Sequence, residues 1–248
     1  MRPVDAHCHI DFEQYDEDRE EVIDEAKEKL EFIVNAGSNL ENNREVLDLS
    51  REHEEFIIPN LGLHPTYTDS FGELDDIKAQ IREEMPAAVG EIGLDHHHVS
   101  EKQVRKRQEK IFREMLELAE ELNLPVVVHS RDAERKTVDI LKEYALPDVM
   151  VHCFNGKPEL AEEAVEEGMT IGVTTQVLYS NRVQEIVKAL NADDILLETD
   201  SPFLYRGERN SPVKVLESVE KVAEIKNVDE EKVIQASTEN AVSIFGRP

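Results

Sequence analysis

Short apolar segments alternate along the chain with longer segments in which apolar residues recur every three or four positions. Several of the short segments, such as Pro125-Val126-Val127-Val128, are continuously apolar, which is typical of parallel strands covered on both faces. Strands that alternate with helices in this way predict an α/β fold, a (β/α)8 TIM barrel. The predicted strands are 4–10, 32–36, 56–63, 87–93, 125–130, 148–154, 169–173 and 195–200.

The intervening segments have the periodicity of amphipathic helices. From Val104 to Leu122, apolar residues recur at helical spacing and leave a face of Glu, Lys and Arg for solvent. After the last predicted strand, 213–225 and 229–245 are also predicted to be helices, the second with Asp229 as its N-cap. We expect the helices to pack against the outside of the barrel.

The alternation of strands and helices runs through all 248 residues. The ten prolines and ten glycines are scattered, and no Ser/Gly-rich or Pro-rich linker divides the chain. We therefore predict one domain spanning residues 1–248. A chain of this length is within the range in which α/β barrels form a single domain.

The sequence favours a cytoplasmic protein without a membrane segment. The first strand-like pattern begins at Val4, which leaves no room for a secretory leader, and no segment approaches about 18 consecutive apolar residues. Cys8 and Cys153 each adjoin a histidine in an apolar segment, so we expect packed, reduced thiols rather than a disulfide.

The chain carries 55 acidic and 28 basic residues, for a formal net charge of -27. So much negative charge repels itself and nucleic acid unless salt or bound cations screen it. Acidic residues concentrate on predicted helix surfaces, as in 13–31 and 162–167, which indicates a solvated shell. We expect adaptation to a salty cytoplasm, with multivalent cation binding as a smaller contribution.

Side chains that can bind metals or transfer protons follow the predicted strands at the same end. In an extended strand Asp5, His7 and His9 share one face, because side chains alternate. In a barrel the carboxyl ends of all strands meet at one face, where active sites lie. The residues expected to meet there are His7, His9, His64, Glu91, His129, His152 and Asp200. Their imidazoles and carboxylates together predict a divalent metal site.

Each of these residues has a simpler explanation when it is taken alone. His129 or His152 by itself is typical of a hydrogen-bonded core histidine, and Glu91 of a buried ion pair. Asp200, before Ser201-Pro202, is also typical of a turn. His64 precedes Pro65 and fits either contact with a substrate phosphate or bracing of the rim. The run His96-His97-His98 favours exposed or supporting positions over metal ligation. Their joint occurrence at six strand ends is what favours a metal site.

Six short motifs carry the candidate residues in order along the chain. They are Asp5-Ala6-His7-Cys8-His9, Gly62-Leu63-His64-Pro65, Gly90-Glu91-Ile92-Gly93-Leu94-Asp95, His129-Ser130-Arg131-Asp132-Ala133, His152-Cys153-Phe154-Asn155-Gly156 and Glu198-Thr199-Asp200-Ser201-Pro202. As an ordered set they resemble the signatures of TatD-type deoxyribonucleases in the amidohydrolase superfamily. The resemblance extends from residue 5 to Asn240-Ala241, which is nearly the whole chain.

The resemblance implies a TIM barrel with a pair of divalent metals that hydrolyses DNA phosphodiesters with a metal-bridging water. The matched ligands are His7, His9 and Asp200 for one metal, His129 and His152 for the other, and Glu91 as the bridge. Histidine-rich ligands favour Zn²⁺ or Mn²⁺, since Mg²⁺ prefers oxygen, although members of the family are commonly assayed with Mg²⁺. The chain departs from the family at His96 and His97, where an aromatic residue is usual, and at Asn155, where Ser is more frequent.

Hydrolysis of an anionic phosphodiester requires charge neutralisation and a nucleophile near neutral pH, which two metals can supply. Asp200 is the predicted general base, and Glu91 is the second catalytic carboxylate. Asp5 is predicted to steady a ligand histidine or its metal without binding the metal directly. The predicted contacts to substrate phosphate are His64, Arg131, Lys157 and Arg206; for the three cationic residues the alternative is ordinary surface charge.

Other metal-dependent enzymes use similar sets of metal ligands. A mononuclear purine or cytosine deaminase barrel also has a strand-one histidine pair and a strand-eight aspartate, but Glu91 favours a bridged pair of metals. A D-aminoacyl-tRNA deacylase, which cleaves an ester, is a second alternative. A non-catalytic metal-binding protein is a third, although structural zinc sites are normally closed by four ligands. The predicted partner is DNA, as single strands or ends, with no membrane and no obligate protein partner.

Overall fold

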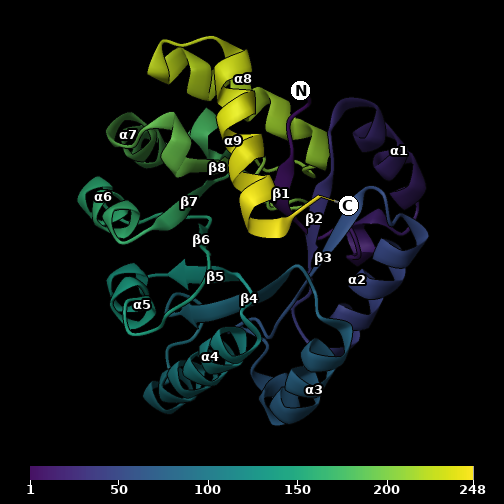
Figure 1. Cartoon of the computed structure of the whole chain (residues 1–248), viewed down its shortest axis with the longest axis vertical. Helices are drawn as coiled ribbons and strands as arrows, with labels where there is room; N and C mark the ends of the chain where they lie inside the picture. The colour runs from purple at the N-terminus through teal and green to yellow at the C-terminus, as the bar shows by residue number, and fades with distance from the viewer. Residues whose placement is uncertain (248) are drawn as a thin grey trace.

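The computed structural model describes residues 1–247, so Pro248, the last residue of the predicted domain, lies outside the described part. Its centre is a sheet of eight parallel strands in the order β1 to β8 (Figure 1). The strands are β1 (Asp5–Cys8), β2 (Ile33–Ala36), β3 (Ile57–Leu61), β4 (Ala88–Asp95), β5 (Val126–Arg131), β6 (Val149–His152), β7 (Met169–Val173) and β8 (Ile195–Leu197). The predicted α/β barrel is confirmed.

The sheet closes into a barrel where β1 meets the segment that follows β8. Cys8 and Ser201 form a parallel bridge, and the His9 amide donates to the Ser201 carbonyl over 2.8 Å. The Asp200 amide donates to the His7 carbonyl over 2.9 Å. Closure therefore places the first motif of the chain against the last one.

Four strands, β1, β3, β6 and β8, end two or three residues earlier than the apolar pattern predicts. The pattern carries the sixth strand to residue 154 and the eighth to residue 200, but β6 ends at His152 and β8 at Leu197. Cys153 has a φ of 47° and Asp200 a φ of 56°, both in the left-handed region. A residue in that region cannot continue an extended strand, so the chain turns at the barrel mouth.

Helices follow the strands around the outside of the barrel (Figure 1). They are α1 (Arg19–Lys29), α2 (Leu40–Glu52), α3 (Leu74–Glu84), α4 (Lys102–Leu122), α5 (Glu134–Leu141), α6 (Pro158–Glu166), α7 (Asn181–Ala189), α8 (Val215–Lys226) and α9 (Glu230–Phe245). The three helices whose ranges the sequence predicts, α4, α8 and α9, agree to within two residues. Asp229 is the N-cap residue of α9, but its side chain makes no capping hydrogen bond.

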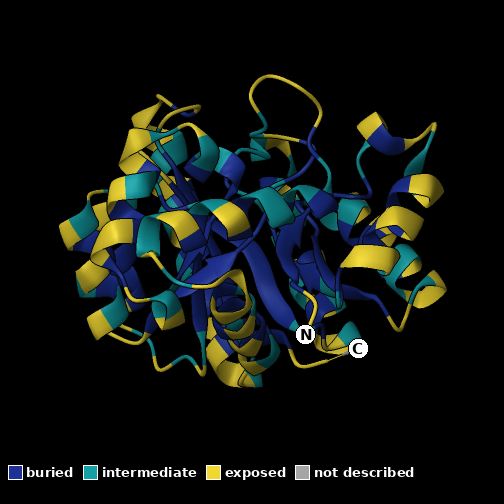
Figure 2. Ribbon diagram, turned by 90° about the horizontal axis from the view of Figure 1, so that it is seen from above, coloured by how far each residue is buried: buried dark blue, intermediate teal, exposed yellow. Residues whose placement is uncertain are grey.

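The core lies between the strands and their covering helices. In Figure 2 the strands at the centre are buried, whereas the outer faces of the helices are exposed. All residues of β4 are buried, as expected for a parallel strand covered on both faces. Cys8 is buried and directs its sulfur towards the Val34 carbonyl, and neither Cys8 nor Cys153 forms a disulfide.

Acidic side chains on the helix surfaces form ion pairs with the fewer basic ones. Arg135 on α5 contacts Glu163 on α6 at 2.7 Å, and Arg113 on α4 contacts Glu143 at 2.7 Å. Such exposed pairs contribute little to stability individually. Among residues 1–247, none of the helices combines the length and the apolar character needed to cross a membrane.

Candidate metal centre

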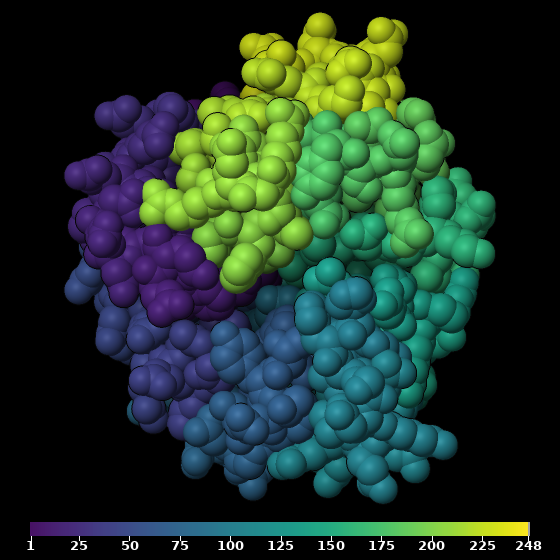
Figure 3. Space-filling model, turned by 180° about the vertical axis from the view of Figure 1, so that it is seen from behind, coloured from purple at the N-terminus to yellow at the C-terminus, as the bar shows by residue number. Residues whose placement is uncertain are grey.

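A cavity of about 550 Å³ opens at the carboxyl ends of the strands. Figure 3 views the molecule from behind, where the segment after β8 lies beside the N-terminal residues around a central hollow. The cavity lining includes His9, His64, Glu91, His129, His152 and Asp200. His7 is fully buried, and its ring stacks on that of His152 with 3.7 Å between the centroids. The structure therefore brings all the predicted metal ligands together.

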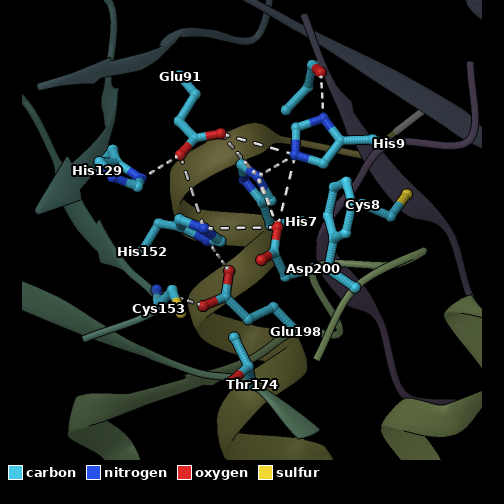
Figure 4. Close-up of polar contacts among 12 residues, drawn as sticks. His7, Cys8, His9, Glu91, His129, His152, Cys153, Thr174, Glu198 and Asp200 are labelled. Carbon is cyan, nitrogen blue, oxygen red and sulfur yellow. Dashed lines mark hydrogen bonds and ion pairs between the residues drawn. The ribbon is translucent and has the colours of Figure 1, made fainter. Parts of the chain in front are cut away.

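Four donor atoms converge on the β1 side of the cavity (Figure 4). Nε2 of His7 lies 3.2 Å from Nε2 of His9 and 3.3 Å from Oε2 of Glu91. Oδ1 of Asp200 lies 3.8 Å from the His7 nitrogen and 3.5 Å from the His9 nitrogen. We call these four atoms the first donor set.

The second oxygen of Glu91 belongs to a different group of donors. Its Oε1 lies 2.8 Å from Nδ1 of His129 and 3.3 Å from Nε2 of His64, and those two nitrogens are 3.2 Å apart. Nε2 of His152 lies 3.7 Å from the same glutamate oxygen and 3.7 Å from Oδ1 of Asp200. We call the donors of Glu91 Oε1, His129, His64 and His152 the second donor set.

The spacing of these atoms fits metal coordination. Zinc binds histidine nitrogen and carboxylate oxygen at about 2.0–2.2 Å, so neighbouring ligands of a tetrahedral site lie roughly 3.3 Å apart. The separations given above run from 2.8 Å to 3.8 Å and bracket that value. Neutral imidazoles and ionised carboxylates are also the ligands that zinc and manganese accept.

Burial and neighbouring charges shift the pKa values of these groups in opposite directions. Burial raises the pKa of Glu91, but the histidines around it, led by His64 and His152, outweigh burial and hold that pKa well below its usual value. Burial lowers the pKa of His9 and His129, yet the adjacent carboxylates raise each pKa to about 9. Without metal, Glu91 is therefore ionised and these two histidines are protonated at neutral pH.

His152 is oriented from behind by Glu198. Its Nδ1 lies 2.6 Å from Oε2 of Glu198, and the Cys153 amide donates to the other carboxylate oxygen over 2.7 Å. Glu198 is fully buried, and Gly172 on β7 leaves room for it, because a Cβ at that position would lie 2.5 Å from Oε1. Since Nδ1 is held by the carboxylate, Nε2 of His152 faces the cavity.

Asp95 supports His129 in a similar way. Nε2 of His129 lies 3.1 Å from Oδ2 of the buried Asp95, which leaves Nδ1 to face Glu91. Oδ2 also lies 2.9 Å from Nδ1 of His98, while Oδ1 accepts hydrogen bonds from the amides of His97 and His98. His98 lines the cavity and thus connects to His129 through one carboxylate. The neighbouring His97 pairs instead with the exposed Asp132 at 3.0 Å.

Asp5 lies against the backbone that leads to Asp200. Its Oδ1 accepts from the Thr199 amide over 2.8 Å, and its Oδ2 accepts from the Thr199 hydroxyl over 2.6 Å. Oδ1 also lies 3.4 Å from the His7 amide, whereas Nδ1 of His7 has no hydrogen-bond partner within residues 1–247. Asp5 therefore holds the backbone of both motifs and makes no bond to the His7 ring.

The residues predicted to contact substrate do not all lie at the cavity. Arg131 ends β5 and lines the cavity, and His64 lies among the metal donors. Lys157 and Arg206 are exposed and are not part of the cavity lining. Of the three predicted cations, only Arg131 is therefore placed beside the metal donors.

The supporting carboxylates Asp95 and Glu198 have no assigned role in the sequence-based prediction. Alternation along a strand is the signal that points to them. Asp95 lies four residues after Glu91 on β4, and Glu198 lies two residues before Asp200, so each is expected on the same face as its partner. Their contacts with His129 and His152 depend on the packing of neighbouring strands.

Taken together, an eight-stranded α/β barrel with buried histidine and glutamate clusters at its mouth defines a metal-dependent hydrolase of the amidohydrolase fold. The family model described as TatD related DNase matches residues 4–246. The chain belongs to this TatD family.

Similar proteins include both unassigned hydrolases and a deoxyribonuclease. An uncharacterized metal-dependent hydrolase of Methanocaldococcus jannaschii, MJ1582, is 36% identical over 100% of this chain and 98% of that protein. Human deoxyribonuclease TATDN3 is 32% identical over 98% of this chain and 94% of that protein. The crystal structure of YJJV, a TatD homologue from Escherichia coli, is 30% identical, with a TM-score of 0.88 over 100% of this chain and 99% of that one.

Proposed function

We propose that this protein hydrolyses phosphodiester bonds of DNA, using two divalent metal ions held by the two donor sets. The observation that carries the proposal is the position of Glu91, whose two oxygens belong to separate sets. A carboxylate shared in this way suits a metal pair about 3.5–4 Å apart. The predominance of imidazole favours Zn²⁺ or Mn²⁺ over Mg²⁺.

We assign His64 to the second metal, in place of the predicted contact with substrate phosphate. Its Nε2 is as close to Nδ1 of His129, at 3.2 Å, as the two nitrogens of the first set are to each other. Its Nδ1 lies 2.7 Å from the Thr66 hydroxyl, which leaves Nε2 to face the donors. This outer contact is the kind that orients a ligand histidine.

Metal ions at these positions would neutralise charge on the ester and make a water molecule more acidic. Burial raises the pKa of Asp200, but the hydrogen bond with His9 and the charges of nearby histidines outweigh burial and lower it. Asp200 is therefore ionised at neutral pH and acts as the general base that accepts the proton of the attacking water. Arg131, in the same cavity, pairs with a phosphate oxygen of the substrate.

DNA is proposed as the substrate because the family model and the human relative are both named as DNases. The metal donors lie in the floor of a cavity, with His9 and His152 each less than a tenth exposed. A single strand or a strand end can enter such a cavity, whereas a duplex must first open. We also propose that the protein acts in the cytoplasm without an obligate protein partner.

The proposal is tested with protein loaded with Mn²⁺ or Zn²⁺ and single-stranded DNA. We expect Asp200→Asn to slow hydrolysis at least about 100-fold, since removal of a general base typically costs that much. Asp139→Asn, which changes an exposed aspartate on α5, serves as the matched control and should cleave DNA as the wild type does. Equal rates for wild type and Asp200→Asn would contradict the assigned base.

A second experiment separates the metal site from the choice of substrate. The double variant His7→Ala/His9→Ala should lose bound metal, measured by elemental analysis. A parallel panel offers the loaded wild type DNA, a D-aminoacyl-tRNA and purine and cytosine nucleosides. Release of a D-amino acid or of ammonia without cleavage of DNA would replace the proposed function with one of its alternatives.

A further inference from the structure

An aromatic wall formed by Phe12, Tyr67 and Phe203 borders the metal cavity. All three residues line it together with the metal donors. The ring of Phe12 stacks on that of His9 with 4.7 Å between centroids, and the ring of Phe203 meets Phe12 edge-on at 5.9 Å. Tyr67 lies edge-on to His64 at 6.1 Å. The wall therefore adjoins both donor sets.

Phe203 presents its ring to solvent at the mouth, where it is 42% exposed. Its backbone is fixed, since its amide donates to the Asp200 carbonyl over 2.9 Å and its carbonyl accepts from Nδ2 of Asn210 over 2.7 Å. Asn210 is itself fully buried. Exposing a large apolar ring has no benefit for folding, and an exposed ring carried by a fixed backbone next to a site is suited to binding a flat apolar ligand.

The other large exposed apolar side chains do not share this position. Among residues 1–247 they are Met1, Met85 and Tyr179, and none of them lines the cavity. The cavity lining also contains polar groups: Nδ2 of Asn155 donates to Oε1 of Gln176 over 2.9 Å, and Arg131 belongs to the same lining. The cavity thus combines anion-binding and hydrogen-bonding groups with one flat apolar surface.

Beyond the aromatic wall the surface becomes acidic. A second cavity of about 490 Å³ shares Phe12, Tyr67 and Phe203 with the first, and its other lining residues include Asp11, Glu13, Asp16, Glu41 and Glu45. A phosphate against this side of the wall would meet like charges. A neutral planar group would not, so the wall favours a base over the sugar-phosphate chain.

We propose that the aromatic wall, and Phe203 above all, is the stacking site for the nucleobase next to the scissile phosphate. This inference rests on the proposed function, because it assumes that a phosphodiester reaches the metal donors. Stacking on an aromatic side chain accepts every base, since each has a flat π-face. The wall therefore binds nucleotides without selecting a sequence, and it distinguishes them from phosphodiesters that lack a base.

The test uses the dinucleotide TpT and its two analogues in which one base is replaced by hydrogen. Each substrate has a single phosphodiester, so the missing base is always the neighbour of the bond that breaks. We expect the wild type to show a kcat/KM for TpT about tenfold above that for at least one analogue, a ratio typical of one base–aromatic stack. Phe203→Leu, which keeps apolar bulk without a flat face, should bring that ratio close to one, and Phe203→Trp should retain it.

Met85→Ala provides the control, because it removes an exposed apolar side chain outside the cavity and should leave the ratio unchanged. Metal content and thermal unfolding of each variant show whether the fold and donor sets are intact. Hydrolysis of TpT and both analogues at equal kcat/KM by the wild type would overturn the stacking site and leave the proposed function standing. If the wild type hydrolyses none of TpT, the analogues and longer single-stranded DNA, both the stacking site and the proposed function are overturned.

Discussion

Nδ1 of His152 lies 2.6 Å from the fully buried Oε2 of Glu198 (Figure 4). Burial raises the pKa of Glu198 to about 8 in the absence of metal, so this carboxyl group is held where ionisation is costly. A buried carboxyl group at this position has a clear use if it orients a metal-binding imidazole. The contact links the residue that follows β8 to β6 behind the second donor set.

Glu198→Gln is expected to weaken metal binding by tenfold or more. The amide keeps the volume of the carboxyl group but cannot ionise when a metal binds and offers only one acceptor oxygen, so it holds Nδ1 of His152 less firmly. Competition with a chelator of known affinity measures the change. Glu217→Gln, which alters a glutamate bonded to Tyr205 and Lys214, is the control. Unchanged affinity in Glu198→Gln would remove this residue from the metal site.

His98→Ala is expected to weaken metal binding several-fold, whereas His97→Ala is not. His98 holds Asp95, and Asp95 holds His129. Loss of the His98 imidazole therefore loosens the candidate ligand His129. The His97 ring bonds to the exposed Asp132 and packs edge-on against His98 at 4.9 Å, but it makes no bond to Asp95, so it provides a control within the same run. The two variants are compared by metal titration followed with calorimetry. Similar losses in both would indicate a general disturbance of the loop.

Metal uptake is expected to release protons and to strengthen as the pH rises towards about 9. His9 and His129 have pKa values of about 9 without metal, so both carry a proton at neutral pH. A metal binds the neutral ring and must displace that proton, which changes apparent affinity about tenfold per pH unit for each proton released. Calorimetry in buffers with different ionisation enthalpies counts the protons. The idea fails if uptake at pH 7 releases none.

Asp11→Asn is expected to stabilise the metal-free protein at pH 7. Asp11 is 5% exposed, neither of its carboxylate oxygens has a hydrogen-bond partner within residues 1–247, and burial raises its pKa from 3.8 to about 6. In the folded protein Asp11 therefore keeps a proton that the unfolded chain releases. The free energy of unfolding falls as the pH rises from about 4 to about 6. The loss is at most about 3 kcal/mol at pH 7.

The measurement for Asp11 is the free energy of unfolding in urea for wild type and Asp11→Asn, made at pH 4 and pH 7. The two proteins should be similar at pH 4, because the wild-type carboxyl group is then mostly protonated when folded. The variant should be more stable at pH 7. A constant difference at both pH values would show that ionisation of Asp11 is not the cause.

The sequence by itself determined the barrel and which candidate side chains meet at its mouth. Continuous apolar runs define parallel strands, and the carboxyl ends of such strands must meet at one face. This rule is enough to gather His7, Glu91, His129 and Asp200 without knowing any contact between them. It works because all strands of such a barrel run in the same direction, so their carboxyl ends meet at one face whatever the side-chain packing.

Only the tertiary structure decided which groups hold these candidate ligands in place and which side chains border the cavity. The pairing of Glu198 with His152 depends on the register of neighbouring strands and on the space left by Gly172. Lys157 has the charge expected of a phosphate contact, yet it lies outside the cavity lining, whereas the exposed Phe203 borders it. These differences arise because loop residues after a strand take backbone angles, such as those of Asp200, that no periodic pattern encodes.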